Sequence, residues 1–386
     1  MKNYSYYRGL WSFLIVFGLS LLIAGVPAQG DNTNRSYSLS LCDYTIPETI
    51  YQSLDLGFNY HFYDDPAEDN DNNINRGSAS GSYTYLYANP DYSLNLNASS
   101  HFSLSESEFS YDAYGTGRYN MYLAPSDLFA FGGLGVNFSD DFSEIAGVKA
   151  ITGTGYGRFK NVTPMAKAKL INITLLQRAA ILRDLPEDIV RQIARKIGGI
   201  TPETEMEALV DEIVSLIEED ESLEGEKLGP IDGLRIREII EDGISQRLCG
   251  WEVRGGLAYE VLDPQGAERD FLVDAAARFA RPFTPYSQLF LEMDFASTLE
   301  LTEDYTLNGL ADYTYRLNDN LDTKFQYSLL YRESESGSFY YQNLLATAEL
   351  KLRQNVSTSI TFSLSDATDY EEMAKEITVG LSYDLI

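Results

Sequence analysis

The chain has little cysteine, histidine or positive charge for its length. Its 386 residues include 2 Cys, 2 His and 29 Lys and Arg, against 58 Asp and Glu, which gives a formal net charge of -29. Nucleic-acid binding needs a basic surface, so this composition argues against it. A metal site built from His and Cys ligands, or a redox motif, is disfavoured for the same lack of residues. We therefore expect no cofactor and no nucleic-acid partner.

Long apolar runs are also scarce. Beyond residue 30, no apolar run approaches the roughly 18 residues that a membrane-spanning helix needs. Residues 1–28 are interpreted as a cleavable secretory signal, because Lys2 and Arg8 precede the apolar run 10–26 and small residues follow it. An uncleaved anchor helix is the alternative for this run. We expect an exported protein with an N-terminal periplasmic segment at 29–50.

Aromatic residues are abundant instead. The chain has 28 Tyr and 19 Phe, and its mean hydropathy is nevertheless negative, at -0.23. This aromatic content does not fit a disordered acidic chain. Tyrosine suits positions where one end of the ring is apolar and the other is wet, as at a membrane interface. The composition therefore favours a folded protein that meets a membrane.

Apolar and polar residues alternate along most of the chain. In the segment 51–63, for example, Leu54, Leu56 and Phe58 lie between polar residues. Such alternation predicts strands with one apolar face, as in a soluble sandwich or a barrel, and spanning length with aromatic strand ends favours the barrel. We predict an all-β transmembrane antiparallel barrel of about fourteen strands, with twelve as the alternative count. The expected strands lie near 51–63, 76–88, 91–104, 107–123, 127–138, 145–159, 249–262, 268–281, 286–299, 304–317, 320–333, 339–352, 355–366 and 375–386.

Long polar connections and tight turns are distributed unevenly between the two ends of the expected strands. If both termini face the periplasm, the odd-numbered connections lie outside the cell and the even-numbered ones lie inside. Long polar loops outside and tight turns on the periplasmic side are typical of outer-membrane barrels. The odd set includes 64–75, 333–338 and 367–374, and the even set includes 89–91, 318–320 and 353–355.

Residues 160–248 interrupt the strand pattern. Apolar residues recur there at helical spacing, for example from Met206 to Ile213, and predict four amphipathic helices. Short amphipathic helices bury little surface alone, so we expect a small bundle between barrel strands at 51–159 and 249–386. Because the insert follows the sixth strand, it is expected in the periplasm, where it can meet a protein or cell-wall partner.

Three residue pairs suggest where these helices begin and end. Thr163-Pro164 and Thr201-Pro202 each predict an N-cap threonine followed by a first-turn proline. Gly198-Gly199 predicts the end of a helix.

The C-terminal residues resemble the assembly signal of bacterial outer-membrane β-barrel proteins. Thr378-Val-Gly380-Leu-Ser-Tyr383-Asp-Leu385 matches its pattern of a polar residue, a glycine and two hydrophobic positions, with Gly380, Tyr383 and Leu385 as the signal residues. Ile386 extends one residue beyond the motif, where many members of the family end on Phe. The resemblance implies insertion in outer-membrane lipid, with the barrel-assembly machinery as a partner.

Charged residues of both signs occupy the polar face of strands seven to twelve. Balanced charge on one wall predicts salt bridges lining an aqueous lumen. Two functions remain open: a pore for small polar solutes, and a non-conducting structural or docking protein whose helical insert binds a periplasmic partner. The lumen-lining candidates are Arg254, Asp274, Arg278, Glu292, Asp294, Asp312, Arg316, Lys324, Arg332, Glu349 and Lys351, with Glu252, Glu260, Asp270 and Arg353 on the same face.

Catalysis has one weak candidate. His101 and Ser103, with acidic residues nearby at Glu106 and Glu108, resemble the His-x-Ser arrangement of outer-membrane lipid A deacylases. In that family the site faces lipid, whereas strand parity turns these residues inward. An outer-membrane lipid hydrolase is therefore the third hypothesis, and we expect the protein not to be an enzyme.

Three other features have structural interpretations. The acidic stretch 64–73 offers oxygen ligands for Ca²⁺ but lacks the spacing of a defined calcium loop, so a solvated loop is favoured. The glycines at 132–135 and 153–157 indicate curvature or close approach of strands. Cys42 and Cys249 both face the periplasm, and a disulfide between them requires the N-terminal segment to cross the barrel mouth.

Overall fold

The computed structural model describes most of the chain beyond the N-terminal segment. The expected signal at 1–28, most of 29–50 and the acidic loop 64–73 lie outside the described residues. The described residues are 40–44, 48–63, 74–105, 108–123, 126–140, 146–200, 204–219, 227–241, 244, 246–263, 271–299, 304–318, 320–334, 337–353, 356–368, 370 and 372–383.

The described residues form fourteen strands and four α-helices, with a short 3-10 helix before the first strand. The elements are η1(Leu41–Asp43), β1(Thr49–Tyr63), β2(Ile74–Ala88), β3(Tyr92–Ser105), β4(Glu108–Tyr122), β5(Leu128–Ser139), β6(Gly147–Asn161), α2(Thr163–Gln177), α3(Glu187–Gly198), α4(Met206–Glu218), α5(Pro230–Glu241), β7(Leu248–Leu262), β8(Phe271–Thr284), β9(Ser287–Thr298), β10(Tyr305–Asn318), β11(Leu321–Ser334), β12(Gly337–Arg353), β13(Val356–Ala367) and β14(Ala374–Tyr383).

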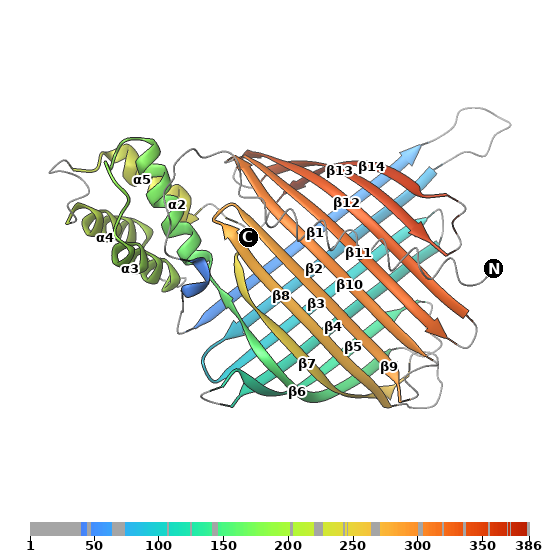
Figure 1. The fold of residues 1–386 in the computed structure, drawn as a ribbon. Coiled ribbons are helices and arrows are strands. Elements are labelled where there is room, and N and C mark those ends of the chain that lie inside the picture. Colours follow the sequence, from blue (N-terminus) through green and yellow to red (C-terminus); the bar gives the residue numbers. More distant parts are fainter. Residues whose placement is uncertain are drawn as a thin grey trace.

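The strands form a single antiparallel sheet in sequence order, from β1 to β14 (Figure 1). This meander, interrupted by a helical insert between β6 and β7, confirms the predicted fold class and its fourteen strands. The sheet curves strongly, but among the described residues no ladder pairs β1 with β14. The sheet is therefore rolled without being closed.

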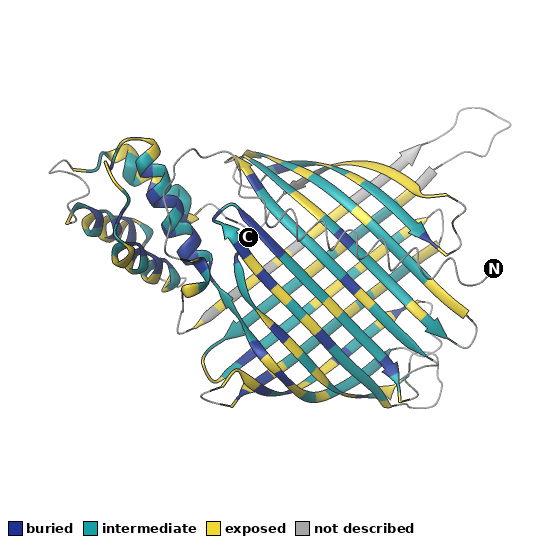
Figure 2. Ribbon diagram, viewed as in Figure 1, coloured by how far each residue is buried: buried dark blue, intermediate teal, exposed yellow. Residues whose placement is uncertain are grey.

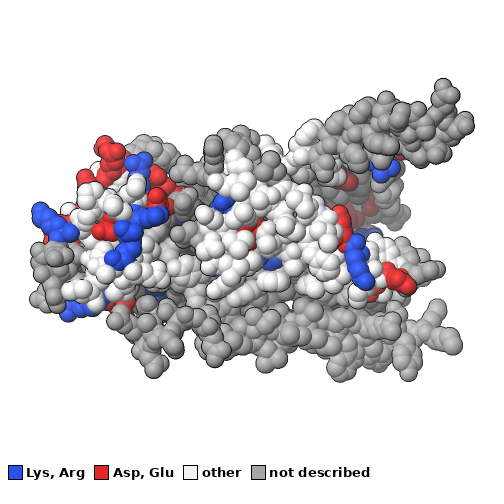
Figure 3. All heavy atoms as spheres, turned by 90° about the horizontal axis from the view of Figure 1, so that it is seen from above, with Lys and Arg blue, Asp and Glu red and all other residues white. Residues whose placement is uncertain are grey.

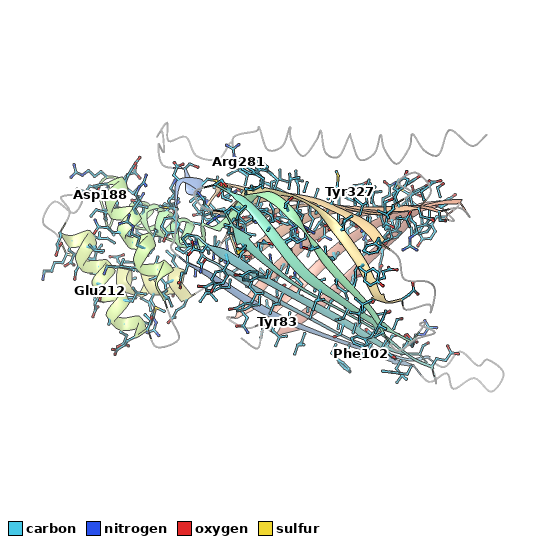
Figure 4. All side chains as sticks on the ribbon, turned by 90° about the horizontal axis from the view of Figure 1, so that it is seen from below. Tyr83, Phe102, Asp188, Glu212, Arg281 and Tyr327 are labelled. Carbon is cyan, nitrogen blue, oxygen red and sulfur yellow. A yellow bond between two sulfur atoms is a disulfide. The ribbon has the colours of Figure 1, made fainter. Side chains whose placement is uncertain are left out.

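One face of the sheet is apolar and exposed. Phe58 is 82% exposed, and Ile377 and Val379 are each 70% exposed. Tyr83 and Phe102 lie on the same outer face of β2 and β3 (Figure 4). The visible surface of the sheet carries few charges, whereas charges gather on the helical insert (Figure 3). Such an apolar exterior is unfavourable in water and is stabilised in a lipid environment.

The helical insert has its own hydrophobic core. Val162, Met165, Ile171, Ile193 and Ile213 are all fully buried within it (Figure 2). Ion pairs join its helices at the surface, such as the Lys196 Nζ–Glu212 Oε2 contact of 2.6 Å between α3 and α4. Exposed pairs of this kind contribute at most about 1 kcal/mol each, so apolar burial supplies most of the stability. In the described part of the chain, no helix combines the length and the apolar character needed to cross a membrane.

The predicted helix ends are partly right. Gly199 is the C-cap of α3, as the glycine pair indicated. Thr163 is not an N-cap: Val162 holds that position, and Thr163 is the first residue of α2. The reason is that the Thr163 hydroxyl donates to Asn161 Oδ1 and accepts from the Arg247 N–H, which ties it to the base of the insert. Thr201-Pro202 lies outside the described residues, and α4 begins at Met206.

A disulfide joins the N-terminal segment to the start of β7. Cys42 and Cys249 are bonded, with their Cα atoms 5.5 Å apart. The segment reaches this position by docking on the insert, where Leu41 and Tyr44 enter the helical core. The Tyr44 hydroxyl donates to Ala194 O at 2.7 Å, and burial raises the pKa of Tyr44 to about 12. Cys42 therefore lies beside the insert and the start of β7, and β1 begins seven residues later, at Thr49.

Candidate functional site: an ion-paired layer inside the sheet

The glycines of β5 and β6 make the tightest part of the sheet. A Cβ added to Gly155 would lie 2.8 Å from Val253 O and would overlap the Phe129 ring. Gly157 has a φ of +113°, a conformation that other residues rarely adopt. Phe129 and Phe131 occupy the space above these glycines and are almost completely buried. Strands β4 and β7 can therefore approach each other across β5 and β6.

Two ion pairs reach across this curved face between strands that are not neighbours. Arg118 Nη2 on β4 lies 3.0 Å from Glu252 Oε1 on β7, across β5 and β6. Arg254 Nη2 on β7 lies 3.1 Å from Asp294 Oδ1 on β9, across β8. Side chains can pair over intervening strands only on a concave face. This polar face is therefore the interior of the rolled sheet.

A third pair completes an interior charge layer. The Arg278 guanidinium donates through Nε to Glu292 Oε1 at 2.6 Å, between the adjacent strands β8 and β9. Glu252 also lies 3.7 Å from Arg254 Nη1, which links the first two pairs. The interior charge layer is defined as Arg118, Glu252, Arg254, Arg278, Glu292 and Asp294, three bases and three acids.

The layer is largely removed from water. The Arg118 and Glu252 side chains are only 12% and 5% exposed. Buried charges are costly unless they are paired, and breaking such a pair destabilises a protein strongly. Among the described residues, Arg118 Nε and Arg254 Nη1 are buried and make no hydrogen bond, so the ion pairs alone hold these two nitrogens.

Two cavities meet at this layer. The first has a volume of about 540 Å³ and extends toward the β5–β6 and β7–β8 connections, where Lys149 and Glu260 line it. The second has a volume of about 200 Å³ and extends toward the helical insert, where Leu248 and Phe159 line it. Both cavities are lined by β3 and by β8 and β9, so these walls face each other. The residues that line both are Asn95, Asn97, Arg118, Arg278 and Glu292.

Apart from Asp274, which is on β8, the remaining predicted lumen residues lie on β10 to β12. Lys324 Nζ lies 2.8 Å from Asp312 Oδ2. Arg316 and Lys351 each lie 3.3 Å from Asp322, which bridges them. Glu349 lies across from Asp322 and Arg332 lies across from Thr306, both on the polar face. Asp274 lines the first cavity.

Arg247 anchors the insert to the barrel end. Its side chain is 1% exposed and donates through Nε to Pro285 O at 3.1 Å, in the β8–β9 turn. Burial lowers its pKa to about 10, so it remains charged at neutral pH. The Val162 N–H donates to Arg247 O at 2.8 Å, which extends the β6–β7 pairing into the base of the insert.

Some site residues were not identified from the sequence. Arg118 is one of them, although its alternation with Tyr114, Thr116 and Asn120 indicates the polar face of its strand. Phe129 and Phe131 lie on the same face of the sheet as Arg118, across from Tyr122 and Asn120, and therefore point inward. No periodic signal reveals them, because the room for them comes from glycines on the neighbouring strand.

The structure does not assemble a hydrolase-like site from the described residues. Ser103 Oγ lies 2.5 Å from Ser110 Oγ on β4, while His101 is exposed and lies across from Asp112. Glu106 lies outside the described residues. In the described ranges no cluster of His, Cys, Asp and Glu is arranged to hold a metal ion.

The assembly-signal residues lie at the end of the sheet. Gly380 lies across from Ser359 in β14, and its carbonyl accepts from the Thr358 hydroxyl at 3.0 Å. Tyr383 is the last residue of β14, and Leu385 lies outside the described residues.

Comparison with known proteins adds little on function. Residues 242–339 are similar to DUF481, a protein family of unknown function. No curated protein matches the sequence. One solved structure, a deltaS2 mutant of the TodX monoaromatic hydrocarbon channel, is 7% identical with a TM-score of 0.29, covering 90% of this chain and 82% of that one.

Two other solved structures are similarly distant. The CymD monoaromatic hydrocarbon channel is 9% identical with a TM-score of 0.29, over 94% of this chain and 95% of its own. The translocator domain of the autotransporter NalP from Neisseria meningitidis is 8% identical with a TM-score of 0.22, over 98% of this chain and 97% of its own. These likenesses are too weak to support an argument.

Proposed function

We propose that the protein is a non-enzymatic outer-membrane pore that conducts small polar solutes through the interior of its sheet. One observation carries the proposal. The same strands present an apolar outer face and a charged inner face with two adjoining cavities. A lipid-facing exterior around a polar interior is the arrangement of outer-membrane channels.

The interior charge layer limits the size of what passes. It lies where the two cavities meet, so a solute must pass the Arg118–Glu252 and Arg278–Glu292 pairs. Paired side chains fix the width of this passage. Small polar solutes fit the proposal, whereas polymers and folded chains do not.

Connection lengths orient the protein in the proposal. The β8–β9, β10–β11 and β12–β13 connections lie at the end of the sheet that carries the helical insert, and each spans two residues (285–286, 319–320 and 354–355). The opposite end has the longest connections, 64–73 and 263–270, although β3–β4 and β11–β12 are also joined by two residues there. Short connections are typical of the periplasmic side of outer-membrane barrels, which supports a periplasmic position for the insert. Outer-membrane lipid surrounds the apolar face, and the barrel-assembly machinery reads the C-terminal signal.

Conductance in planar bilayers tests the pore. The full-length protein, refolded in detergent and shown by its gel mobility to be compact before boiling, is expected to give discrete current steps. A compact, β-rich preparation that never conducts contradicts the proposal.

The alternative is a docking protein whose insert binds a periplasmic partner. It is supported by the separate hydrophobic core of the insert and by the charge layer across the lumen. Replacing residues 163–246 by a short linker discriminates between the two. A pore gated by the insert conducts more after the replacement, whereas a docking protein shows no change in current and loses its partner.

A further inference from the structure

We propose that the first cavity binds a small zwitterion, a solute whose ammonium and carboxylate groups lie close together as in an α-amino acid. This inference rests on the proposed pore function and names its substrate class. It follows from three properties of the cavity: one acid that forms no ion pair among the described residues, two arginines that line the same cavity, and a lining with equal numbers of bases and acids.

Asp274 supplies the site for the ammonium group. It lines the first cavity from β8, and its register partners are Gly256 on β7 and Ala296 on β9. Neither neighbour carries a charge or a long side chain. Within the described part of the chain, Asp274 makes no ion pair. A carboxylate that lines an aqueous cavity between two uncharged neighbours can pair with a cationic group of a solute.

Arg254 and Arg118 supply the site for the carboxylate group. Arg254 Nη2 pairs with Asp294 at 3.1 Å, and Arg254 Nη1 lies 3.7 Å from Glu252 Oε1 without a hydrogen bond to any described residue. Arg118 pairs with Glu252 through Nη2, and its Nε makes no hydrogen bond within the described part of the chain. Both arginines line the first cavity. Donors on charged groups favour an anionic acceptor over a neutral one.

The distance between the ammonium site at Asp274 and the carboxylate site at Arg254 suits a compact zwitterion. Arg254 lies two residues along β7 from Gly256, the register partner of Asp274. Residues in this diagonal relation on one face have Cα atoms about 7–8 Å apart, within reach of long side chains. Arg254 and Asp274 are therefore close enough on one face for a compact zwitterion to contact both side chains.

Charge balance excludes a net-charged solute as the best ligand. The cavity is lined by four bases and four acids: Arg118, Lys149, Arg254 and Arg278, and Glu260, Asp274, Glu292 and Asp294. A simple anion is attracted by the arginines and repelled by Asp274, and a simple cation meets the opposite pattern. A neutral polyol replaces the water around these charged groups without supplying an opposite charge. A zwitterion satisfies both, and the amides of Asn95, Asn97 and Asn308 accommodate the rest of it.

Liposome swelling with the full-length protein tests the inference. Serine is the zwitterionic probe and erythritol is the uncharged probe of similar size. We expect serine to enter wild-type proteoliposomes about tenfold faster than erythritol, which corresponds to about 1.4 kcal/mol. Asp274→Asn is expected to bring the ratio close to one while leaving erythritol entry unchanged.

Two further variants complete the design. Arg254→Lys keeps a positive charge for Asp294 but lacks the second terminal nitrogen of the guanidinium group, so it should also reduce the preference for serine. Glu349→Gln is the matched control, because it neutralises an acid on β12 outside the first cavity. It should retain the wild-type ratio. Each variant must show the compact gel mobility of the wild type.

The outcomes separate the site from the pore. Equal entry of both probes into wild-type vesicles overturns the zwitterion site and leaves the pore intact. An unchanged ratio in Asp274→Asn overturns the assignment to this cavity. Entry of neither probe overturns the pore and the inference together.

Discussion

Replacing Glu252 by Gln tests whether the interior charge layer holds the rolled sheet together. Glu252 is 5% exposed and lies 3.0 Å from Arg118 and 3.7 Å from Arg254. At an effective dielectric constant of about 20, the Arg118–Glu252 attraction amounts to about 5 kcal/mol, much of which offsets desolvation. Removing one partner leaves a buried arginine uncompensated, and we expect a loss of about 3–5 kcal/mol in the free energy of unfolding.

Urea unfolding in detergent, followed by tryptophan fluorescence, measures this loss. Glu349→Gln on β12 is the control and should change stability by less than about 0.5 kcal/mol. The double variant Arg118→Met, Glu252→Met removes both charges and should recover most of the lost stability, since well-packed apolar pairs often replace buried ion pairs without cost. If Glu252→Gln and the control differ by less than about 1 kcal/mol, the pairing across β5 and β6 does not stabilise the sheet.

Three further predictions concern other parts of the fold. Gly155→Ala should destabilise the sheet by about 1–3 kcal/mol because its methyl group meets the Phe129 ring, and a refolding yield equal to that of wild type would contradict this. Reducing the Cys42–Cys249 disulfide, or the double Ser variant, should cost about 2–5 kcal/mol in urea unfolding, since the bond closes a loop of 207 residues in sequence separation. Tyr44 has a folded pKa of about 12 against 10.0 in the unfolded chain. Its contribution to the free energy of unfolding is therefore fully present below pH 10 and is lost as the pH rises toward 12. Circular dichroism of the helices should show this alkaline loss in wild type, and Tyr44→Phe should lack it.

The positions of the strands follow from local pattern, so the sequence predicts them well. Strand β11 was expected at 320–333 and occupies Leu321–Ser334, because alternation leaves only one register that keeps Phe325 and Tyr327 out of the lumen. The outer face of β14 is predicted equally well, from the alternating apolar residues Ile377 and Val379.

The contents of the lumen depend on contacts between distant strands, which a pattern of period two does not encode. Arg118 and Glu252 are 134 residues apart in sequence, and their pairing requires the glycines between them to bend the sheet. The inward Phe129 depends on Gly155 in the same way. The sequence alone does not predict the disulfide, because the position of Cys42 depends on where the N-terminal segment docks. That position is set by the packing of Leu41 and Tyr44 in the helical insert.

The Cys42–Cys249 bond turns the first half of the molecule into a macrocycle. Residues 42 to 249 form one covalent ring that contains β1 to β6 and the whole helical insert, while β8 to β14 remain a linear tail. A single proteolytic cut anywhere inside that ring opens it without releasing a fragment. Nicked protein therefore migrates as one band until a reductant is added, and a cut in the helical insert does not detach the first six strands from the other eight.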